Sequence, residues 1–246
     1  MHDKFHDSAG VPWEGREFSQ NSWSQDDGST PAVLAAALEG ELDKSKLFIA
    51  LAESRLLIPL LAELGESGVG PHGQTVDKSA DLAIVAVSTP DGKTAIPAFS
   101  SVSEMATWNS TARPVPVDAP KLAVAAVSEG HDRVVLNPAG RAIGLRRPAL
   151  AALAQGLPWT PAHLDERVQK MVTTAAASHP EIVSVKLFDS DPEANLTKPE
   201  LGIEIGLAAG LAKPELERVL AEFGVGCQTQ EFLQLVDSFA IRLVAV

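Results

Sequence analysis

Four residues between positions 99 and 137 could form a binding site, and two of them, Trp108 and Arg113, are of the types that supply most of the binding energy in such sites. Phe99, Trp108 and Arg113 lie close together in the sequence, and Asn137 opens the turn Asn-Pro-Ala-Gly. A rigid aromatic ring and a guanidinium fork together can recognise a partner. The alternative is structural, with both rings in the core and Arg113 stacked on Trp108 or bound to a loop carbonyl. We keep Phe99, Trp108, Arg113 and Asn137 as candidate binding residues, with both interpretations open.

Residues 189–200, the acidic loop, offer a second kind of chemistry because their carboxylates follow the spacing of a calcium-binding loop. Oxygen-bearing side chains occupy its first, third, fifth and twelfth positions, namely Asp189, Asp191, Glu193 and Glu200. The sixth position is Ala194, where the sharp turn of an EF-hand needs glycine, and the flanking patterns predict strands rather than helices. The sequence therefore favours an acidic hairpin loop, and we expect no metal.

Candidate nucleophiles and bases are scattered. Cys227 is the single cysteine, and no histidine lies near it in the sequence, so we expect a buried small side chain rather than a nucleophile. His72, His131, His163 and His179 are isolated, and neither a His-Glu-x-x-His motif nor a Gly-x-Ser-x-Gly elbow occurs. The sequence does not decide whether the protein is an enzyme, but it favours a protein without catalytic activity. It predicts no cofactor.

The composition limits the partners and the compartment. The chain has 246 residues, 45% of them hydrophobic, and a net charge of -12. This charge repels a phosphate backbone, so nucleic acid is a poor partner. One cysteine excludes an internal disulfide framework, and we find neither a secretory signal nor a run of about 18 apolar residues. We therefore expect a cytoplasmic protein without a membrane partner.

The patterning between residues 31 and 156 predicts a sheet flanked by helices. We expect helices after Pro31 and after a cap at Asp43, and a strand at residues 55–64. A hairpin at residues 81–99 turns at Pro-Asp-Gly and leads into a short helix that ends near Trp108. Further on, we expect a helix capped by Asp118, two short strands around the Asn137 turn, and a helix closed by Gly156.

The C-terminal region predicts a smaller unit. Helical spacing precedes residue 179, and alternating apolar residues at 183–187 and 201–207 predict two half-buried strands. A second helix should end at Gly224, residues 230–236 favour helix over strand, and residues 239–243 predict a final strand. The fold class is therefore α+β (mixed α/β), with two small domains that each contain a sheet flanked by helices.

We place the predicted domain boundaries by composition. Residues 1–30 are polar and predict a flexible arm, residues 31–156 form the N-terminal domain, and residues 162–246 form the C-terminal domain. Two prolines within residues 157–161 predict a stiff linker between the domains. The glycine-rich segment at residues 65–80 lacks the Gly-Lys-Ser/Thr of a phosphate-binding loop, and we expect a plain connection there.

One stretch carries a family resemblance. The segment Ala-Ile-Pro-Ala-Phe-Ser-Ser at residues 95–101, followed by Trp108 and then Arg-Pro-Val-Pro at residues 113–116, resembles the bacterial enhanced-serine-sensitivity (SseB) family. Arg-Leu-Leu-Ile-Pro at residues 55–59 and Val-Val-Leu-Asn-Pro-Ala-Gly at residues 134–140 extend the likeness, while Ser100 stands where the family usually has threonine. The resemblance implies an α/β cytoplasmic protein with no established reaction, and it supplies no catalytic residues.

Two functions follow as hypotheses. The first is a non-catalytic binding or interaction protein that uses the residues around Trp108 and Arg113. The second is an enzyme or small-molecule sensor linked to amino-acid (serine) metabolism, with a site at the domain junction. A protein partner and a homo-oligomer formed through a sheet edge both stay open, and the sequence does not identify a small molecule.

Overall fold

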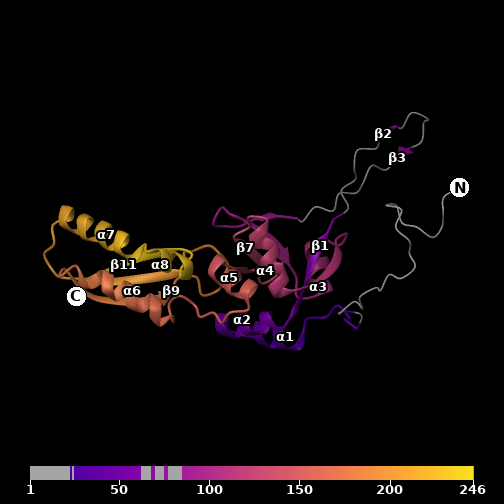
Figure 1. Ribbon diagram of the computed structural model, residues 1–246, viewed down its shortest axis with the longest axis horizontal. Coiled ribbons are helices and arrows are strands. Elements are labelled where there is room, and N and C mark those ends of the chain that lie inside the picture. Colours follow the sequence, from indigo (N-terminus) through magenta and orange to yellow (C-terminus); the bar gives the residue numbers. More distant parts are fainter. Residues whose placement is uncertain (1–22, 24, 62–67, 70–74, 77–84, 246) are drawn as a thin grey trace.

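The computed structural model describes residues 23, 25–61, 68–69, 75–76 and 85–245. Figure 1 shows two bodies side by side along the long axis, one made by the described residues between positions 31 and 156 and the other by residues 162–245. We call them the N-terminal part and the C-terminal part. Each has its own large cluster of buried apolar side chains. The α+β fold class predicted from the sequence is confirmed.

The described residues of the N-terminal part alternate between helices and short strands. The helices are α1 (Ala32–Leu38), α2 (Lys44–Ala52), α3 (Val102–Trp108), α4 (Ala119–Ser128) and α5 (Arg147–Gln155). The strands are β1 (Arg55–Leu60), β2 (Gly68–Val69), β3 (Thr75–Val76), β4 (Val87–Ser88), β5 (Thr94–Ala98), β6 (Arg113–Asp118), β7 (Arg133–Leu136) and β8 (Ile143–Leu145). Most of the predicted glycine-rich connection and residues 81–84 of the predicted hairpin lie outside the described residues.

A four-stranded sheet in the order β4-β5-β7-β8 organises the N-terminal part. Strands β4 and β5 form the predicted hairpin, β5 and β7 run parallel, and β8 is an edge strand antiparallel to β7. Strand β1 pairs with β6 and is joined to the end of β5 by a bridge between Leu57 and Phe99. Helices α2, α4 and α5 contribute to the core that packs against these strands.

The helix cap predicted at Asp43 is confirmed, and Ser101 caps the short helix α3. The Asp43 carboxylate accepts hydrogen bonds from the backbone N–H groups of Ser45 and Lys46, and the Ser101 hydroxyl accepts one from Glu104. Asp118 occupies the N-cap position of α4, but its side chain makes no capping hydrogen bond. Its carboxylate pairs with Lys121 instead, so the predicted side-chain cap is wrong.

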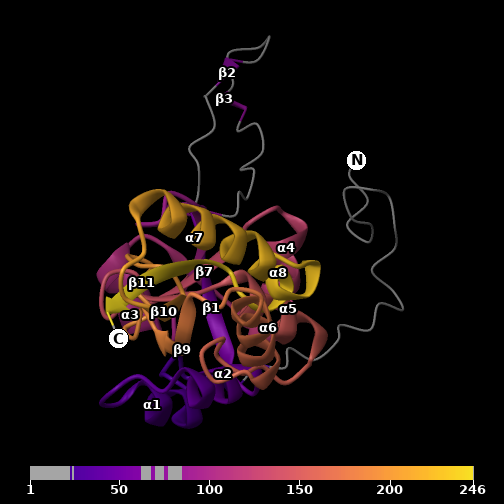
Figure 2. The same ribbon diagram turned by 90° about the vertical axis from the view of Figure 1, so that its left-hand side faces the viewer.

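The C-terminal part is a three-stranded sheet with helices against one face. Its elements are α6 (Glu166–Ala177), β9 (Ile182–Asp189), β10 (Leu201–Leu207), α7 (Lys213–Cys227), α8 (Gln230–Leu235) and β11 (Phe239–Ala245). The strand order is β11-β10-β9, with β9 antiparallel and β11 parallel to β10. Figures 1 and 2 show the three helices alongside this sheet. The predicted strands are confirmed, as is the helix at residues 230–235.

Helix α7 corrects the prediction that Gly224 ends the second helix. The helix continues through Gly224 and Gly226 to Cys227. A β-carbon at Gly226 would come within 3.3 Å of the Ala175 side chain in α6. Glycine there lets two helices approach closely, so the residue serves packing rather than termination.

Residues 25–30, the end of the predicted arm, lie against the N-terminal part. Arg55 in β1 is buried, and its guanidinium forms an ion pair with Asp26 and donates hydrogen bonds to the carbonyl oxygens of Ser29 and Ser100. This segment is therefore attached to β1 and to the end of β5. No helix among the described residues has the length and apolarity needed to cross a membrane.

Candidate functional site

The predicted binding residues Phe99 and Trp108 come together, but mainly inside the molecule. Phe99 is fully buried, and its ring centroid lies 5.4 Å from that of Trp108. Leu57 and Met105 complete this small cluster, in which Trp108 is half-buried. The pair therefore anchors α3 to β1.

Asn137 is also an interior residue. Its side-chain oxygen accepts a hydrogen bond from the Ser100 N–H at 2.9 Å, and its amide donates to the Ser100 hydroxyl at 3.0 Å. Its φ of 50° is one that asparagine tolerates better than most residues. Arg113, by contrast, is exposed, and no described residue accepts a hydrogen bond from its side chain. Of the four residues, Trp108 and Arg113 are thus the ones available to a partner.

The carboxylates of the acidic loop have four different protein partners. The partner residues are Lys44 for Asp189, Arg146 for Asp191, Arg141 for Glu193 and the backbone N–H of Asp237 for Glu200. Across the part of the chain that the structure describes, no three His, Cys, Asp or Glu residues are placed to hold a metal ion. Three of the four carboxylates therefore pair with cations of the N-terminal part, whereas Glu200 binds within the C-terminal part.

The acidic loop docks on the edge strand β8. The Gly144 N–H donates a hydrogen bond to the Ala194 carbonyl oxygen at 2.6 Å. Leu196 is buried against Ala95 and Val135 of the N-terminal part. A β-carbon at Gly144 would lie 2.3 Å from the Leu196 side chain, so the leucine rests directly on the backbone of β8. We call this contact region between the two parts the junction.

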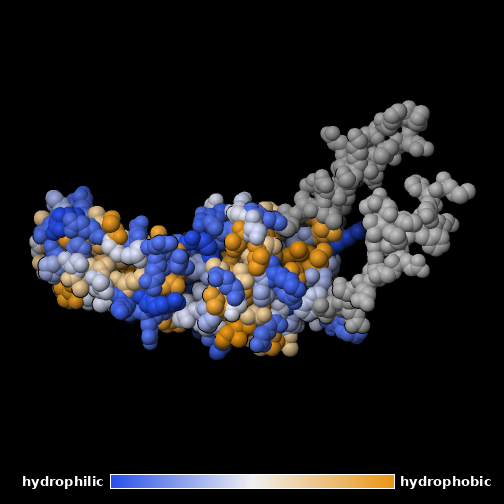
Figure 3. Space-filling view, in the orientation of Figure 1, coloured by the Kyte–Doolittle hydropathy of each residue, from blue (hydrophilic) through white to orange (hydrophobic). Residues whose placement is uncertain are grey.

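Buried ion pairs hold the junction on one side of the loop. Arg133 and Asp237 have side chains that are 1% and 2% exposed, and two hydrogen bonds of 2.9 and 2.7 Å join them. Arg133 also pairs with Asp91 at 2.9 Å. Such a bidentate pair fixes relative orientation as well as distance. Figure 3 shows largely hydrophilic residues where the two parts meet.

Arg146 extends the network from the end of β8. Its guanidinium donates to Asp191 at 2.6 Å, to the Lys198 carbonyl oxygen at 2.6 Å and to Asp237 at 3.2 Å. The Ser238 hydroxyl also accepts from it at 3.2 Å. Every one of these partners belongs to the C-terminal part, so Arg146 connects the acidic loop to the segment that precedes β11.

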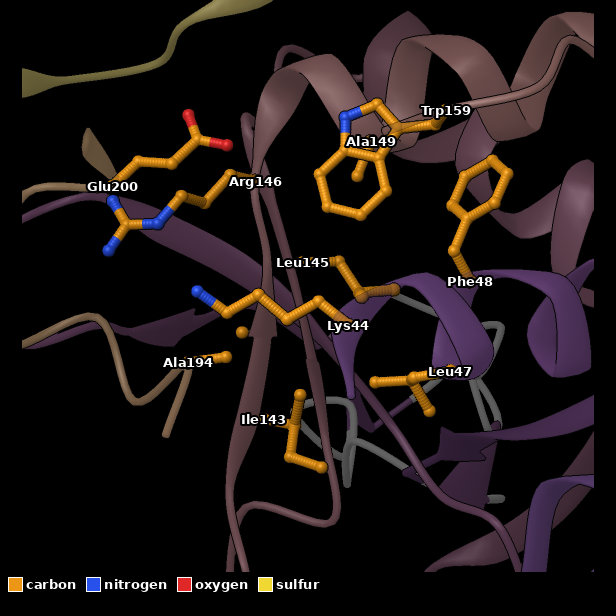
Figure 4. A pocket seen from close by; sticks show the side chains of 11 residues that line it. Lys44, Leu47, Phe48, Ile143, Leu145, Arg146, Ala149, Trp159, Ala194 and Glu200 are labelled. Atoms are coloured by element: carbon orange, nitrogen blue, oxygen red, sulfur yellow. The ribbon is translucent and has the colours of Figure 1, made fainter. Parts of the chain in front are cut away.

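Next to Arg146 lies a small cavity with one polar end (Figure 4). Its apolar lining consists of Leu47, Phe48, Ile143, Leu145, Ala149, Trp159 and Ala194, and its ionisable residues are Lys44, Arg146 and Glu200. Figure 4 shows these three on one side of the cavity and Phe48 with Leu47 on the other. The indole N–H of Trp159 is buried and has no hydrogen-bond partner among the described atoms.

An open groove lies on the other side of Lys44. Its volume is about 490 Å³, against about 30 Å³ for the cavity. The cavity has room for only one or two water molecules, whereas the groove has the size of a ligand pocket. Lys44 lines both spaces, and its ammonium lies 2.8 Å from Asp189. The other residues of the groove are Glu41, Leu42, Asp43, Ser45, Lys46, Pro161, His163 and Leu164.

Three groups that line these spaces have shifted pKa values, and the hydrogen bond from the Lys46 N–H lowers the pKa of Asp43. Burial raises the pKa of Glu200 to about 7, and the charge of Asp237 acts in the same direction. Burial also lowers the pKa of His163, although the charge of Asp189 opposes this. At neutral pH the imidazole is therefore mostly neutral, and the Glu200 carboxyl is close to half protonated.

The groove contains a serine, a histidine and an aspartate, but they do not form a catalytic triad. No hydrogen bond joins Ser45 to His163 or His163 to Asp189 among the described residues. The Asp189 carboxylate is engaged by Lys44 and by the N–H of Asp191. A hydroxyl without a base in contact is not activated as a nucleophile.

Cys227 lies fully buried at the end of α7. Burial raises the pKa of its thiol to about 11, so the thiolate is scarce at neutral pH. Of the isolated histidines, His72 lies outside the described residues, His131 contacts the Thr94 hydroxyl at 3.1 Å, and His179 lies 3.7 Å from Glu222.

Sequence reasoning did not find Lys44, Arg146, Trp159 or Glu200 as one site. They come from α2, the end of β8, the linker and the end of the acidic loop, so no local motif connects them. One signal was present. Trp159 is a large apolar residue inside a proline-rich linker, and such a ring needs a surface to pack on, which Phe48 provides at a centroid distance of 5.4 Å.

Fold and site together define an α+β protein in which two separately cored sheets meet at a buried ionic junction. Residues 31–152 match the family model described as the SseB protein N-terminal domain. The chain belongs to the SseB family, as the resemblance at residues 95–116 predicted. No curated protein and no solved structure matches it.

Proposed function

We propose that this protein binds a small amphipathic molecule at the junction and does not transform it. The observation that carries the proposal is the position of Lys44 between the apolar cavity and the open groove. The N-terminal part, the linker and the acidic loop all contribute to these walls. A bound molecule would therefore contact every segment that sets how the two parts meet.

The cavity sets the requirements for one end of the ligand. Its wall is mostly aliphatic and aromatic, so it favours a short apolar group. The unpaired N–H of Trp159 adds a preference for a hydrogen-bond acceptor nearby, because a buried donor without a partner costs about 1 to 3 kcal/mol. As the cavity accommodates only water, a ligand enters only if the Lys44 side chain moves toward the groove.

The groove sets the requirements for the other end. Both signs of charge line it, with Lys44 and Lys46 opposed by Glu41, Asp43 and Asp189. A molecule that carries one positive and one negative group matches this lining better than a simple cation or anion. Amino acids with an apolar side chain fit both ends. Serine belongs in the test because the family name refers to a serine phenotype.

Isothermal titration calorimetry with the full chain tests the proposal. The panel comprises leucine, valine and serine, together with isocaproate and isopentylamine, which keep only one of the two charges. We expect leucine to bind more tightly than either single-charge analogue. Trp159→Phe keeps the ring but removes the N–H, so it should weaken binding about fivefold. Trp108→Phe is the matched control, because Trp108 lies in the Phe99 cluster and should leave binding unchanged.

Filling the cavity gives the opposing test. Ala149→Leu places a larger side chain in the cavity wall and should abolish binding if the apolar group enters there. Equal heats for leucine, isocaproate and isopentylamine would refute the charge argument. The absence of any binding by the folded wild-type chain, across the whole panel, would refute the proposal itself.

A second candidate function is the binding of a protein partner at Trp108 and Arg113. The observation that favours it is the exposed Arg113 side chain beside a half-buried aromatic cluster. A pull-down that compares the wild type with the folded Trp108→Ala, Arg113→Ala double variant tests it. Loss of a partner is expected, and recovery of every partner by the double variant would reject this candidate.

A further inference from the structure

The acidic loop meets the N-terminal part through a ladder of matched charges. Asp189, Asp191 and Glu193 alternate along the loop, and each faces a cation of the N-terminal part. The distances are 2.8 Å to Lys44, 2.6 Å to Arg146 and 3.3 Å to Arg141. The net charge of the chain is -12, so a row of three cations is an exception on its surface. Because these cations line up with three alternate carboxylates, they form a surface that is suited to an acidic segment.

Two further contacts resemble the way in which peptides are recognised. The Gly144 N–H on the edge strand β8 binds the Ala194 carbonyl oxygen, and Leu196 is 2% exposed in an apolar recess. Backbone pairing at a sheet edge supplies affinity that does not depend on sequence, and a side-chain recess supplies specificity. Together with the charge ladder, these contacts select a segment in which an aspartate is followed five residues later by a leucine, as Asp191 is followed by Leu196.

The loop is strained in its docked form. Ala194 has a φ of 50° and Leu196 a φ of 63°, in the left-handed region that residues other than glycine seldom adopt. Such conformations persist where surrounding contacts impose them and are common in switch segments. Undocking would release this strain, which lowers the cost of replacing the loop with another segment.

We propose that this face of the N-terminal part is a binding site for an acidic peptide segment of a partner protein, and that the acidic loop occupies it in cis. The partner segment carries alternate carboxylates followed by a leucine, as in Asp-x-Asp-x-Glu-x-x-Leu. The tethered loop competes with the partner at an effective concentration in the range of about 1 mM. This inference shares Lys44 and Arg146 with the small-molecule proposal, but it is argued from the edge of β8, the Leu196 recess and the paired charges rather than from the cavity.

Fluorescence anisotropy of a labelled peptide with the sequence of residues 189–200 tests the proposal on the full chain. The Asp191→Asn, Leu196→Ser variant frees the site by weakening the cis loop. We expect the peptide to bind this variant at least about tenfold more tightly than it binds the wild type. Binding should weaken with added salt, and it should be lost with a peptide whose first three carboxylates are replaced by amides or whose leucine is replaced by aspartate.

Three outcomes would overturn the proposal. These are no binding to the folded variant, equal binding to variant and wild type, and equal binding of the neutral or leucine-free peptides. Light scattering tests the alternative that the acidic loop of a second copy of the chain occupies the site. If the variant forms dimers that exchange their loops and does not bind the peptide, the proposal of a peptide site is also contradicted. If the double variant does not fold, hydrogen exchange of the wild type decides. Excess peptide should then speed exchange at the Leu196 amide, and an unchanged rate counts against displacement.

Discussion

The carboxyl group of Glu200 links the stability of the junction to pH. The side chain is 7% exposed, and burial is the main reason that its pKa rises from 4.5 to about 7. The charge of Asp237 raises it further, while the Asp237 N–H and the charges of Arg146 and Lys44 lower it. The folded chain therefore holds this proton more tightly than the unfolded chain does.

The sign and size of the effect follow from this difference. A carboxyl group with a raised pKa in the folded state adds most to stability below pH 4.5, and that contribution is lost as the pH rises to about 7. Since one pKa unit corresponds to about 1.4 kcal/mol, the full contribution is about 3 kcal/mol. Most of it should be lost between about pH 5 and about pH 8.

Urea unfolding of the wild type and of Glu200→Gln near these two pH values measures the effect. Glutamine keeps the acceptor for the Asp237 N–H but carries no ionisable proton. We expect the free energy of unfolding of the wild type to fall by about 2 to 3 kcal/mol between these pH values. The variant should not show this decrease, and it should be the more stable protein near pH 8. Glu193→Gln is the control, because it makes the same substitution at an exposed side chain of the same loop.

The result that refutes this reasoning is simple to recognise. If Glu200→Gln loses as much stability between the two pH values as the wild type does, the Glu200 carboxyl is not the group that titrates. A variant that is less stable than the wild type near pH 8 would also contradict the assigned cost of burying the charge.

Three further predictions concern packing, charge and reactivity. Gly144→Ala should destabilise the chain by about 1 to 3 kcal/mol in urea unfolding, because the added methyl group collides with Leu196. Gly224→Ala is the control in α7, where the methyl group meets nothing within 4 Å, and it should stabilise the chain by up to about 1 kcal/mol. Equal effects of the two substitutions would contradict the close packing on β8. Arg133→Met removes both hydrogen bonds that this guanidinium donates to the buried Asp237 carboxylate and leaves Arg146 as its remaining partner, so it should cost about 3 kcal/mol by the same measurement, the lower end of the range for breaking a buried ion pair; a loss below about 1 kcal/mol would show that water reaches Asp237. Cys227 should react with a thiol reagent only after unfolding, and rapid labelling of the native chain would show that the end of α7 opens.

Local patterns predicted most of the elements. Asp43 and Ser101 sit where a helix start needs an acceptor, and the alternating residues 183–187 and 201–207 form the strands they predict. The prediction that Gly224 ends the helix was wrong because a glycine inside a helix and a glycine at a helix end look alike in sequence, and α7 continues past it to Cys227. The close contact with Ala175 in α6 belongs to the next glycine along α7, Gly226.

The candidate site was much less predictable. The partners of Arg133 and Arg146 lie far along the chain, and charge alone does not show which carboxylate each will meet. The acidic loop was predicted to be a hairpin loop without a metal, but nothing in its spacing showed that cations of the N-terminal part would pair with its carboxylates. Asn137 was selected because it opens a turn, but its buried side chain forms two hydrogen bonds with Ser100.

The pairing of Arg133 with Asp237 also constrains the order of events during synthesis. The two residues are 104 positions apart, so the sheet that contains β7 leaves the ribosome long before its buried arginine can meet this carboxylate. Domains generally fold as they emerge, N-terminal first. Until residue 237 has been made, the nascent N-terminal part therefore carries Arg133 and Arg146 without Asp237, and the two parts can be locked together only after that point.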